Sequence, residues 1–265
     1  MQIAPGVRLT PSADLSFTGT YAPNVYLVGT QKVALIDAGY GNVASVRTRL
    51  EYVDSLGCPK PDFILVTHAH PDHLGGAKKI SEATGARVLL HTADGTSGAE
   101  SVVDGSQIHL GEFRLTVIHT PGHTPGSICI MMEPGRVLFS GDSILGLGTT
   151  VVVPPGGNMA DYVKSLEKLL AMDISLVCPG HGPLVKEPRR KIVELLDHRL
   201  ERERQVLEAM KRGKSTVDGL IAAIYPELDK RLFSLARWQV LAQIDKLVHE
   251  GKVRSVAADT YQVLN

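Results

Sequence analysis

The stretch Thr67-His-Ala-His-Pro-Asp-His-Leu-Gly-Gly76 decides how this sequence is interpreted, because it places three imidazoles and one carboxylate within six residues. It directly follows Phe63-Ile-Leu-Val66, an apolar run with the length and composition of a buried strand. Imidazole and carboxylate are common ligands of zinc and similar cations. Burial of these groups without a cation would leave unpaired polar atoms at high cost. The stretch therefore predicts a metal site at the end of a strand.

Three more apolar runs end in a tight Gly/Pro loop that carries an imidazole or a carboxylate. The loop residues are His123 after Leu115–Ile118, Asp142 after Val137–Phe139, and His181 after Leu176–Cys178. Strand ends of packed sheets can converge on one crevice, and loops on a rigid scaffold are where sites gather. His68, His70 and His123 could then face one cation, and Asp72, His73 and His181 a second, with Asp142 as a bridge. Isolated histidines are usually structural, and we interpret the remaining five in this way: His91, His109, His119, His198 and His249.

The four motifs together resemble those of the metallo-β-lactamase superfamily: THAHPDHLGG (67–76), TPGHTPGS (120–127), SGD (140–142) and CPGHG (178–182). The resemblance covers roughly residues 20–185. It implies an α+β protein, a four-layer αβ/βα sandwich with its metals at one edge. It also implies His68, His70 and His123 on the first metal, and Asp72, His73 and His181 on the second, with Asp142 bridging. We expect two Zn²⁺ ions, with Mn²⁺ or Fe as alternatives. Asp37, in Leu-Ile-Asp-Ala-Gly, is expected to orient the ligand loop, or else simply to form a turn.

Composition supports an ordinary globular protein. The 265 residues are 43% hydrophobic, and 28 Lys and Arg balance 28 Asp and Glu, so no overall charge favours nucleic acid or membrane. No apolar run approaches the roughly 18 residues of a membrane span, and Met1 to Ser16 shows no secretory signal. Cys58, Cys129 and Cys178 are odd in number and scattered, which favours a reducing compartment. We therefore expect a cytoplasmic protein with no membrane partner.

The pattern changes near residue 187, where we place a domain boundary. Residues 1–187 carry 13 basic and 17 acidic residues, whereas residues 188–254 carry 15 and 10. Helical periodicity predicts helices over 188–212, from a cap at Ser215 to Tyr225, and over 232–250, followed by a small hairpin over 252–264. We predict a catalytic domain over 1–187, and a helical linker with a winged-helix domain over 188–265.

Three further stretches resemble the lactamase-β-like endoribonuclease family, which has a C-terminal winged helix. They are Gly141–Thr150, His198–Arg204 and Ile244–Val253. This resemblance extends over nearly the whole chain. It implies a monomeric or dimeric dizinc hydrolase, and some members of that family cleave single-stranded RNA. We therefore keep a homodimer as one expectation.

We expect a dinuclear zinc hydrolase that uses a metal-bridging hydroxide, with Asp72 orienting the nucleophile or transferring its proton. The favoured substrate is a phosphodiester, single-stranded RNA in particular. The alternative is a small-molecule thioester, lactone or other carboxylic ester, as in the glyoxalase II and lactonase branches. The pocket wall is expected to include Leu145, Thr149, Asn158 and Tyr162. Two minor alternatives are a nucleic-acid-binding module with structural metals and an iron-dependent persulfide dioxygenase.

Several activities of the superfamily do not fit the residues present. The commonest class of zinc β-lactamase has Cys where this chain has Asp142, and flavodiiron proteins have Glu in place of His70. Only 38 residues separate Asp142 from His181, which leaves no room for the large inserted domain of the RNA-processing and DNA-repair nucleases.

Overall fold

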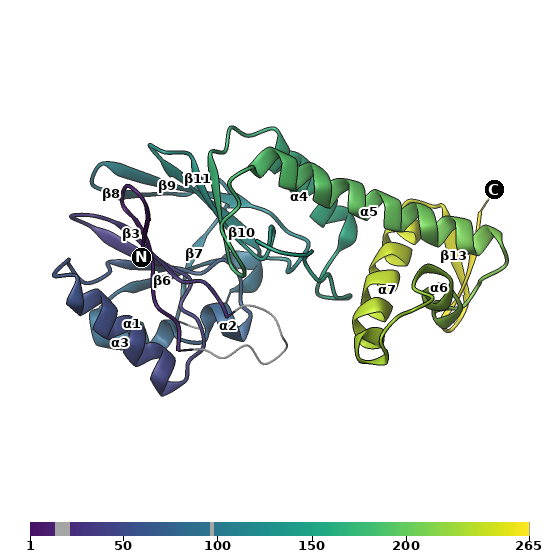
Figure 1. Ribbon diagram of the computed structural model, residues 1–265, viewed down its shortest axis with the longest axis horizontal. Helices are drawn as coiled ribbons and strands as arrows, with labels where there is room; N and C mark the ends of the chain where they lie inside the picture. Colours follow the sequence, from purple (N-terminus) through teal and green to yellow (C-terminus); the bar gives the residue numbers. More distant parts are fainter. Residues whose placement is uncertain (14–21, 96–97, 265) are drawn as a thin grey trace. The chain divides into compact units, whose positions relative to one another are not determined.

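The computed structural model of the chain describes residues 1–13, 22–95 and 98–264 (Figure 1). Residues 14–16, at the end of the stretch in which we expect no secretory signal, lie outside these ranges. Contacts between residues divide the chain into two compact units. The first unit comprises Met1–Thr120, Gly126–Thr150 and Met172–Arg189. The second comprises Pro121–Pro125, Val151–Ala171 and Arg190–Asn265. The domain boundary near residue 187 stays a prediction.

A seven-stranded mixed sheet forms one half of the first unit. Its strands, in spatial order, are β1 (Gln2–Ala4), β2 (Val7–Leu9), β3 (Tyr26–Gly29), β4 (Val33–Ile36), β5 (Phe63–Leu65), β6 (Arg87–His91) and β7 (Glu100–Val102). Neighbours from β1 to β4 are antiparallel, and those from β4 to β7 are parallel. The parallel strands are connected through helices, namely α1 (Val43–Ser55), α2 (Pro71–Leu74), α3 (Ala77–Thr84) and the 3₁₀ turn η1 (Thr92–Asp94).

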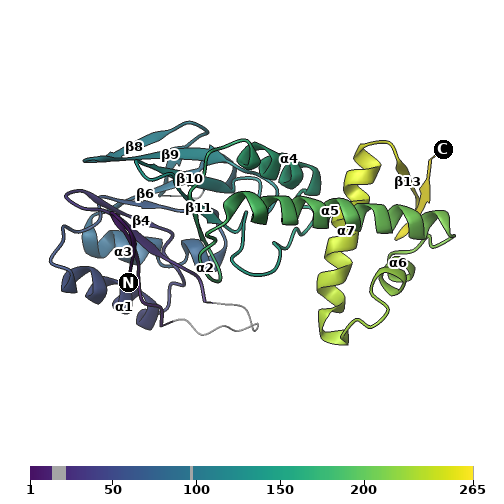
Figure 2. The ribbon, with the colours of Figure 1, turned by 45° about the horizontal axis from the view of Figure 1, so that its top comes forward.

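A five-stranded sheet forms the other half of the first unit. Its spatial order is β12 (Leu176–Pro179), β11 (Val137–Gly141), β10 (Ile128–Glu133), β9 (Phe113–His119) and β8 (Gln107–Leu110); Figure 2 shows β8, β9 and β10 side by side. Only the β11–β12 pair is parallel. β10 and β11 form a hairpin in which Met132 lies opposite Val137 and Gly135 lies in the turn.

Two apolar layers hold the first unit together. In the first layer, side chains of both sheets face one another, for example Ile36 and Leu65 against Ile130 and Phe139. In the second layer, the opposite face of the seven-stranded sheet packs on α1 and α3. Such burial contributes about 25 cal/mol per Å² of apolar surface. The mixed sheets and their helices confirm the predicted α+β class.

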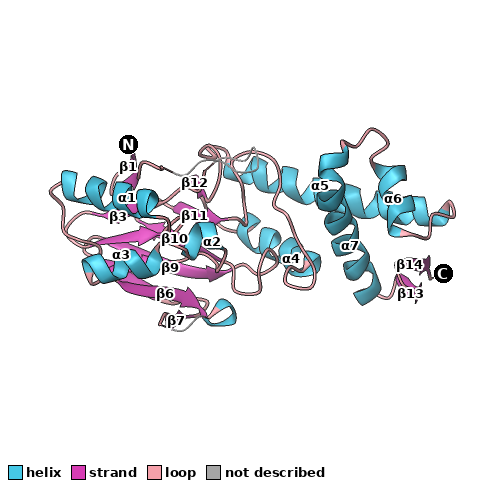
Figure 3. Cartoon of the chain, turned by 90° about the horizontal axis from the view of Figure 1, so that it is seen from below, coloured by secondary structure: helices cyan, strands magenta, loops and turns pink. Residues whose placement is uncertain are grey.

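The second unit is mainly helical. Its elements are α4 (Met159–Leu170), α5 (Pro188–Lys211, of which the first two residues group with the first unit), α6 (Val217–Ile224), the 3₁₀ turn η2 (Lys230–Leu232), α7 (Phe233–His249), β13 (Val253–Ala257) and β14 (Thr260–Val263). Figure 3 shows α6, α7 and the hairpin. Val206, Leu220, Ile244 and Val253 share one core. The order of three helices and a hairpin confirms the predicted winged helix.

One detail of this unit differs from the sequence-based expectation. The cap of α6 is Thr216 rather than Ser215, because the Thr216 hydroxyl accepts the backbone N–H of Gly219. Among the helices that the structure describes, none is long and apolar enough to cross a membrane.

Candidate metal centre

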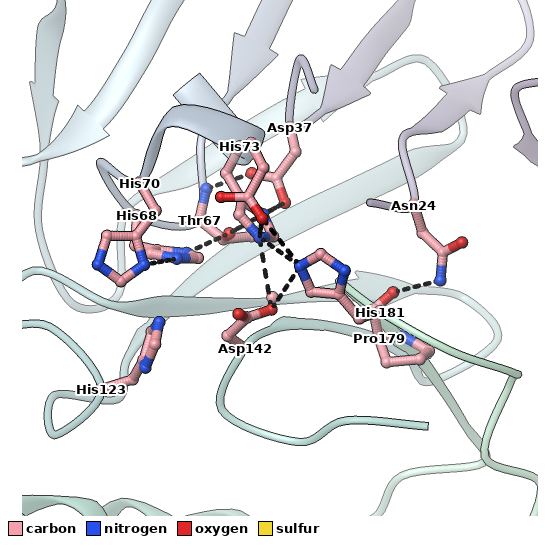
Figure 4. A network of polar contacts seen from close by, with 12 residues as sticks. Asn24, Asp37, Thr67, His68, His70, His73, His123, Asp142, Pro179 and His181 are labelled. Atoms are coloured by element: carbon pink, nitrogen blue, oxygen red, sulfur yellow. Dashed lines mark hydrogen bonds and ion pairs between the residues drawn. The ribbon is translucent and has the colours of Figure 1, made fainter. Parts of the chain in front are cut away.

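The segment after β5 changes direction at Pro71, and this turn presents the motif residues. His70 is extended (φ −68°, ψ 149°) and precedes α2, whose first residue is Pro71. Proline suits this position because its missing N–H would have no partner in the first helical turn. Asp72 and His73 therefore lie on a helical turn, whereas His68 and His70 lie on extended backbone. Asp142 follows β11 and His181 follows β12, so both sheets contribute to the site (Figure 4).

Four donor atoms enclose a space that fits a divalent cation. His73 Nε2 lies 3.2 Å from His181 Nε2, 3.4 Å from Asp142 Oδ1 and 3.9 Å from Asp72 Oδ2. His181 Nε2 lies 3.2 Å from Asp72 Oδ2 and 3.6 Å from Asp142 Oδ1. Zinc ligands at about 2.0–2.2 Å in a tetrahedron are about 3.3–3.6 Å from one another. The measured separations bracket this range, so the donor set fits zinc or a cation of similar size.

Two other predicted ligands, His68 and His70, also lie in this region. Donor atoms of His68, His73 and Asp142 lie within 4.8 Å of one another. His68 Nε2 is 2.9 Å from His70 Nδ1. Asp142 therefore belongs to a group with His68 and also faces the His73–His181 set. Six of the seven predicted ligands thus lie close together in the first unit, whereas His123 belongs to the second unit, and the ligand roles of all seven stay a prediction.

Asp37 and Thr67 fix the orientation of two imidazoles. The Asp37 carboxylate lies 2.7 Å from His73 Nδ1 and accepts the Thr67 backbone N–H at 2.7 Å and the Thr67 hydroxyl at 3.0 Å. Thr67 Oγ1 also lies 3.1 Å from His68 Nδ1. Protons on both Nδ1 atoms would make Nε2 the ring nitrogen through which His68 and His73 could coordinate a cation. Asp37 is buried and has a positive φ of 64°, which is uncommon for a residue other than glycine.

The electrostatics of the site favour positive charge. Burial lowers the pKa of His73, but the carboxylates of Asp37 and Asp142 raise it more, so its pKa lies well above the usual value. Burial raises the pKa of Asp142, and His73 lowers it to well below the usual range. A site whose carboxylates remain ionised while buried beside imidazoles attracts a cation.

Gly180 provides the space for this donor set. A Cβ atom at Gly180 would lie 2.6 Å from Asp142 Oδ1 and 2.7 Å from Cε1 of His73. Only glycine leaves this volume open. Gly180 and Thr67 both occur within the sequence motifs, but the motifs alone predict no role for either residue.

Asn24 is a further residue of the site that the sequence motifs do not reveal. Its side-chain amide donates to the carbonyl oxygens of Pro179 and Gly182, at 3.0 and 2.9 Å, on either side of His181. It therefore holds the loop that carries His181. Nothing in the local sequence distinguishes Asn24 from an ordinary loop asparagine.

The four predicted pocket-wall residues have mixed surroundings. Leu145 and Thr149 are half-buried. Asn158 caps α4, and its side chain accepts the backbone N–H of Asp161. Tyr162 is 1% exposed, and the guanidinium of Arg199 lies 5.1 Å from its ring centroid. A contact between these residues and substrate stays a prediction.

Comparisons with known proteins define the class. The family model described as the metallo-beta-lactamase superfamily matches residues 18–181, and that of the beta-lactamase associated winged helix domain matches residues 216–260. The chain belongs to the metallo-beta-lactamase superfamily, and it is a metal-dependent hydrolase of that superfamily with a C-terminal winged helix.

Individual relatives agree with this class. The beta-lactamase-like protein 2 homolog of Drosophila melanogaster is 33% identical, over 94% of this chain and 89% of that protein. The atrochrysone carboxyl ACP thioesterase of Aspergillus fumigatus is 31% identical, over 79% and 68%. The crystal structure of a beta-lactamase domain protein from Burkholderia ambifaria superposes with a TM-score of 0.87 at 23% identity, covering 100% of this chain and 93% of that one. This last likeness confirms the predicted sandwich and winged helix as a fold.

Proposed function

We propose that the protein is a hydrolase with a dinuclear zinc centre. One cation would be held by His68, His70 and His123. The other would be held by Asp72, His73 and His181, and Asp142 would bind both cations. The observation that carries this proposal is the set of four donor atoms around His73 and His181, with separations of 3.2–3.9 Å. Bound divalent cations would lower the pKa of water to about 7 and stabilise negative charge that develops on the substrate.

The side chains of the site have distinct tasks in this proposal. The side chain of Asp72 is 22% exposed, compared with 15% for Asp142 and 0% for His73. Solvent therefore reaches Asp72 most easily, and we assign it the orientation of the attacking water or the removal of its proton. Asp37 holds the proton on His73 Nδ1 and thereby keeps Nε2 directed at the donor set.

A thioester or other carboxylic ester is the substrate class that we rank first. One support is the relative from Aspergillus fumigatus, whose name states that it is a thioesterase. The second support is the charge of the winged helix: residues 216–260 contain six basic and six acidic residues. Arg237 forms ion pairs with Asp218 and Asp259, and Arg231 pairs with Asp229. Basic side chains that are already paired with carboxylates contribute little to the binding of a phosphate backbone.

A phosphodiester, in particular single-stranded RNA, is the second candidate. It is favoured by the resemblance of residues 141–150, 198–204 and 244–253 to the endoribonuclease family. The sequence alone ranks this substrate first. The paired cations of the winged helix are the reason that we reverse the order.

One panel of assays tests the proposal. The full chain is purified, its metal content is measured, and hydrolysis is followed for acyl thioesters, lactones, bis(p-nitrophenyl) phosphate and a single-stranded RNA. We expect two zinc ions per chain and the highest turnover on thioesters, and we expect the variant Asp142→Ala to lose turnover on every substrate. Faster cleavage of RNA would reverse our ranking. A single iron with oxygen consumption would refute the hydrolytic centre.

A further inference from the structure

Asp94 connects two loops of the candidate site although it belongs to none of the four motifs. It is the last residue of η1, the single turn that follows β6. Asp94 Oδ2 accepts the backbone N–H of Ala69 at 3.0 Å, and Asp94 Oδ1 accepts the backbone N–H of Gly126 at 2.8 Å. One carboxylate thus binds two segments that are 57 residues apart in the sequence.

Both segments carry proposed ligands of the first cation. Ala69 lies between His68 and His70, so its N–H belongs to the backbone that sets the positions of both imidazoles. Gly126 lies three residues after His123, in the loop that leaves β9 and returns at β10. A hydrogen bond from Thr120 N to the Ser127 carbonyl at 2.9 Å closes the base of this loop. Asp94 therefore sets the distance between the two ligand-bearing backbones.

The packing around Asp94 is tight, which makes this connection rigid. A Cβ atom at Gly126 would lie 2.5 Å from both Cγ and the backbone nitrogen of Asp94. Gly126 has an ordinary φ, so this close approach is the reason that the position suits glycine.

The two histidines near Asp94 form a support for the turn. His91 caps η1, because its Nδ1 accepts the backbone N–H of Ala93. Its ring stacks on that of His119, with centroids 4.0 Å apart and planes inclined by 10°. The predicted structural role of these two histidines agrees with this arrangement.

We propose that Asp94 is a positioning residue that sets the affinity of the first metal site. It acts through the backbone of Ala69 and Gly126 and makes no contact with the metal itself. The inference rests on the proposed dinuclear centre. Loss of groups that orient metal ligands typically lowers metal affinity about 10- to 100-fold. A carboxylate is suited to this task because each oxygen accepts one N–H, whereas the amide of asparagine has only one accepting oxygen.

The test measures zinc binding by the full chain in competition with a chromophoric chelator, without any substrate. The variants are Asp94→Ala, Asp94→Asn and the matched control Asp104→Ala. Asp104 Oδ1 likewise accepts a backbone N–H, that of His119 at 2.7 Å, but this bond ends on strand β9 rather than on a ligand-bearing loop. We expect Asp94→Ala to weaken one of the two sites about 10- to 100-fold, Asp94→Asn to have an intermediate effect, and Asp104→Ala to bind both ions as the wild type does.

A second measurement separates positioning from general stability. Melting temperatures are recorded for each variant with and without zinc, because a ligand that binds only the folded state raises the melting temperature according to its affinity. We expect Asp94→Asn to reduce the increment that zinc produces while the metal-free value stays near that of the wild type. Equal affinities in wild type and Asp94→Asn, or equal losses with and without zinc, would overturn the role of Asp94. A wild-type chain that binds no second ion would instead overturn the dinuclear centre.

Discussion

Replacement of Gly180 by alanine tests the geometry of the site with a single methyl group. Gly180 stands between the end of β12 and His181, and its φ lies outside the left-handed region. Alanine therefore adopts this backbone without strain. The methyl group, however, would lie 2.6 Å from Asp142 Oδ1 and 2.7 Å from Cε1 of His73. Ordinary van der Waals contact begins at 3.4 Å, so both side chains must retreat by about 0.7–0.8 Å.

This displacement is large for a metal site. Metal–ligand distances are normally kept within about 0.2 Å of their ideal values, and a misplacement of about 1 Å can cost about 100-fold in rate. We expect kcat/KM of Gly180→Ala to fall about 100-fold, equivalent to about 2.7 kcal/mol. We also expect the affinity for one zinc ion to fall, because two donors of the same set have moved.

The assay compares Gly180→Ala with Gly219→Ala. Gly219 lies in α6 and is remote in sequence from the motifs, and a Cβ there would meet the Thr216 hydroxyl at 3.0 Å and Cδ of the flexible Lys214 side chain at 4.0 Å. Circular dichroism and thermal melting check that both variants fold, and metal content and turnover are then measured. We expect Gly219→Ala to match the wild type. If Gly180→Ala also binds two zinc ions and turns over at the wild-type rate, the donor set tolerates the methyl group and our reasoning from its spacing is wrong.

Three further predictions concern other parts of the chain. Thr67→Val removes the hydroxyl that lies 3.1 Å from Nδ1 of His68. We expect zinc binding, measured by chelator competition, to weaken about 10-fold in Thr67→Val and to be restored in Thr67→Ser. Unchanged zinc binding by Thr67→Val would contradict the role of this hydroxyl in orienting His68. Cys58 is half-buried, whereas the other two cysteines are buried and burial raises the pKa of Cys178 to about 12. A thiol reagent at pH 8 should therefore modify one cysteine in the native protein and three after denaturation. Modification of all three cysteines in the native protein would refute this prediction. Lys246 forms a nearly buried ion pair with Glu203, whose other carboxylate oxygen pairs with Lys252. Lys246→Met leaves Lys252 as the remaining partner of Glu203, so it should destabilise the protein by about 2 kcal/mol in urea, and the double variant with Glu203→Leu should recover part of that loss. A double variant no more stable than Lys246→Met would show that the lost pairing of Glu203 is not the cause.

The longer elements follow directly from the sequence. Periodicity predicts a helix over 188–212 and the structure has α5 at Pro188–Lys211, because apolar spacing acts locally. Strands β1, β2 and β7 are not predictable from local patterns. Each has only three residues, and each is stabilised by a neighbouring strand rather than by a pattern of its own, as β7 is by β6. Such strands depend on the completed sheet.

The candidate site is predictable to a similar degree. The spacing of His68, His70, Asp72 and His73 indicates a metal site, since few other arrangements satisfy so many polar groups at a strand end. Asn24 and Asp94 are not predictable in this way. Their contacts lie 155 and 32 residues away in the sequence, at Pro179 and Gly126, and polar residues are common in loops.

The division of the donors between two sheets has a kinetic consequence. His73 follows β5 of the seven-stranded sheet, whereas Asp142 and His181 follow β11 and β12 of the five-stranded sheet. An ion shared by these groups would cross-link the sheets at one rim, in the manner of a disulfide between layers. Dissociation of the ion would then require the two sheets to separate locally at this edge. The lifetime of the metal-bound protein would therefore depend more on local opening of the sandwich than on the strength of any one coordinate bond.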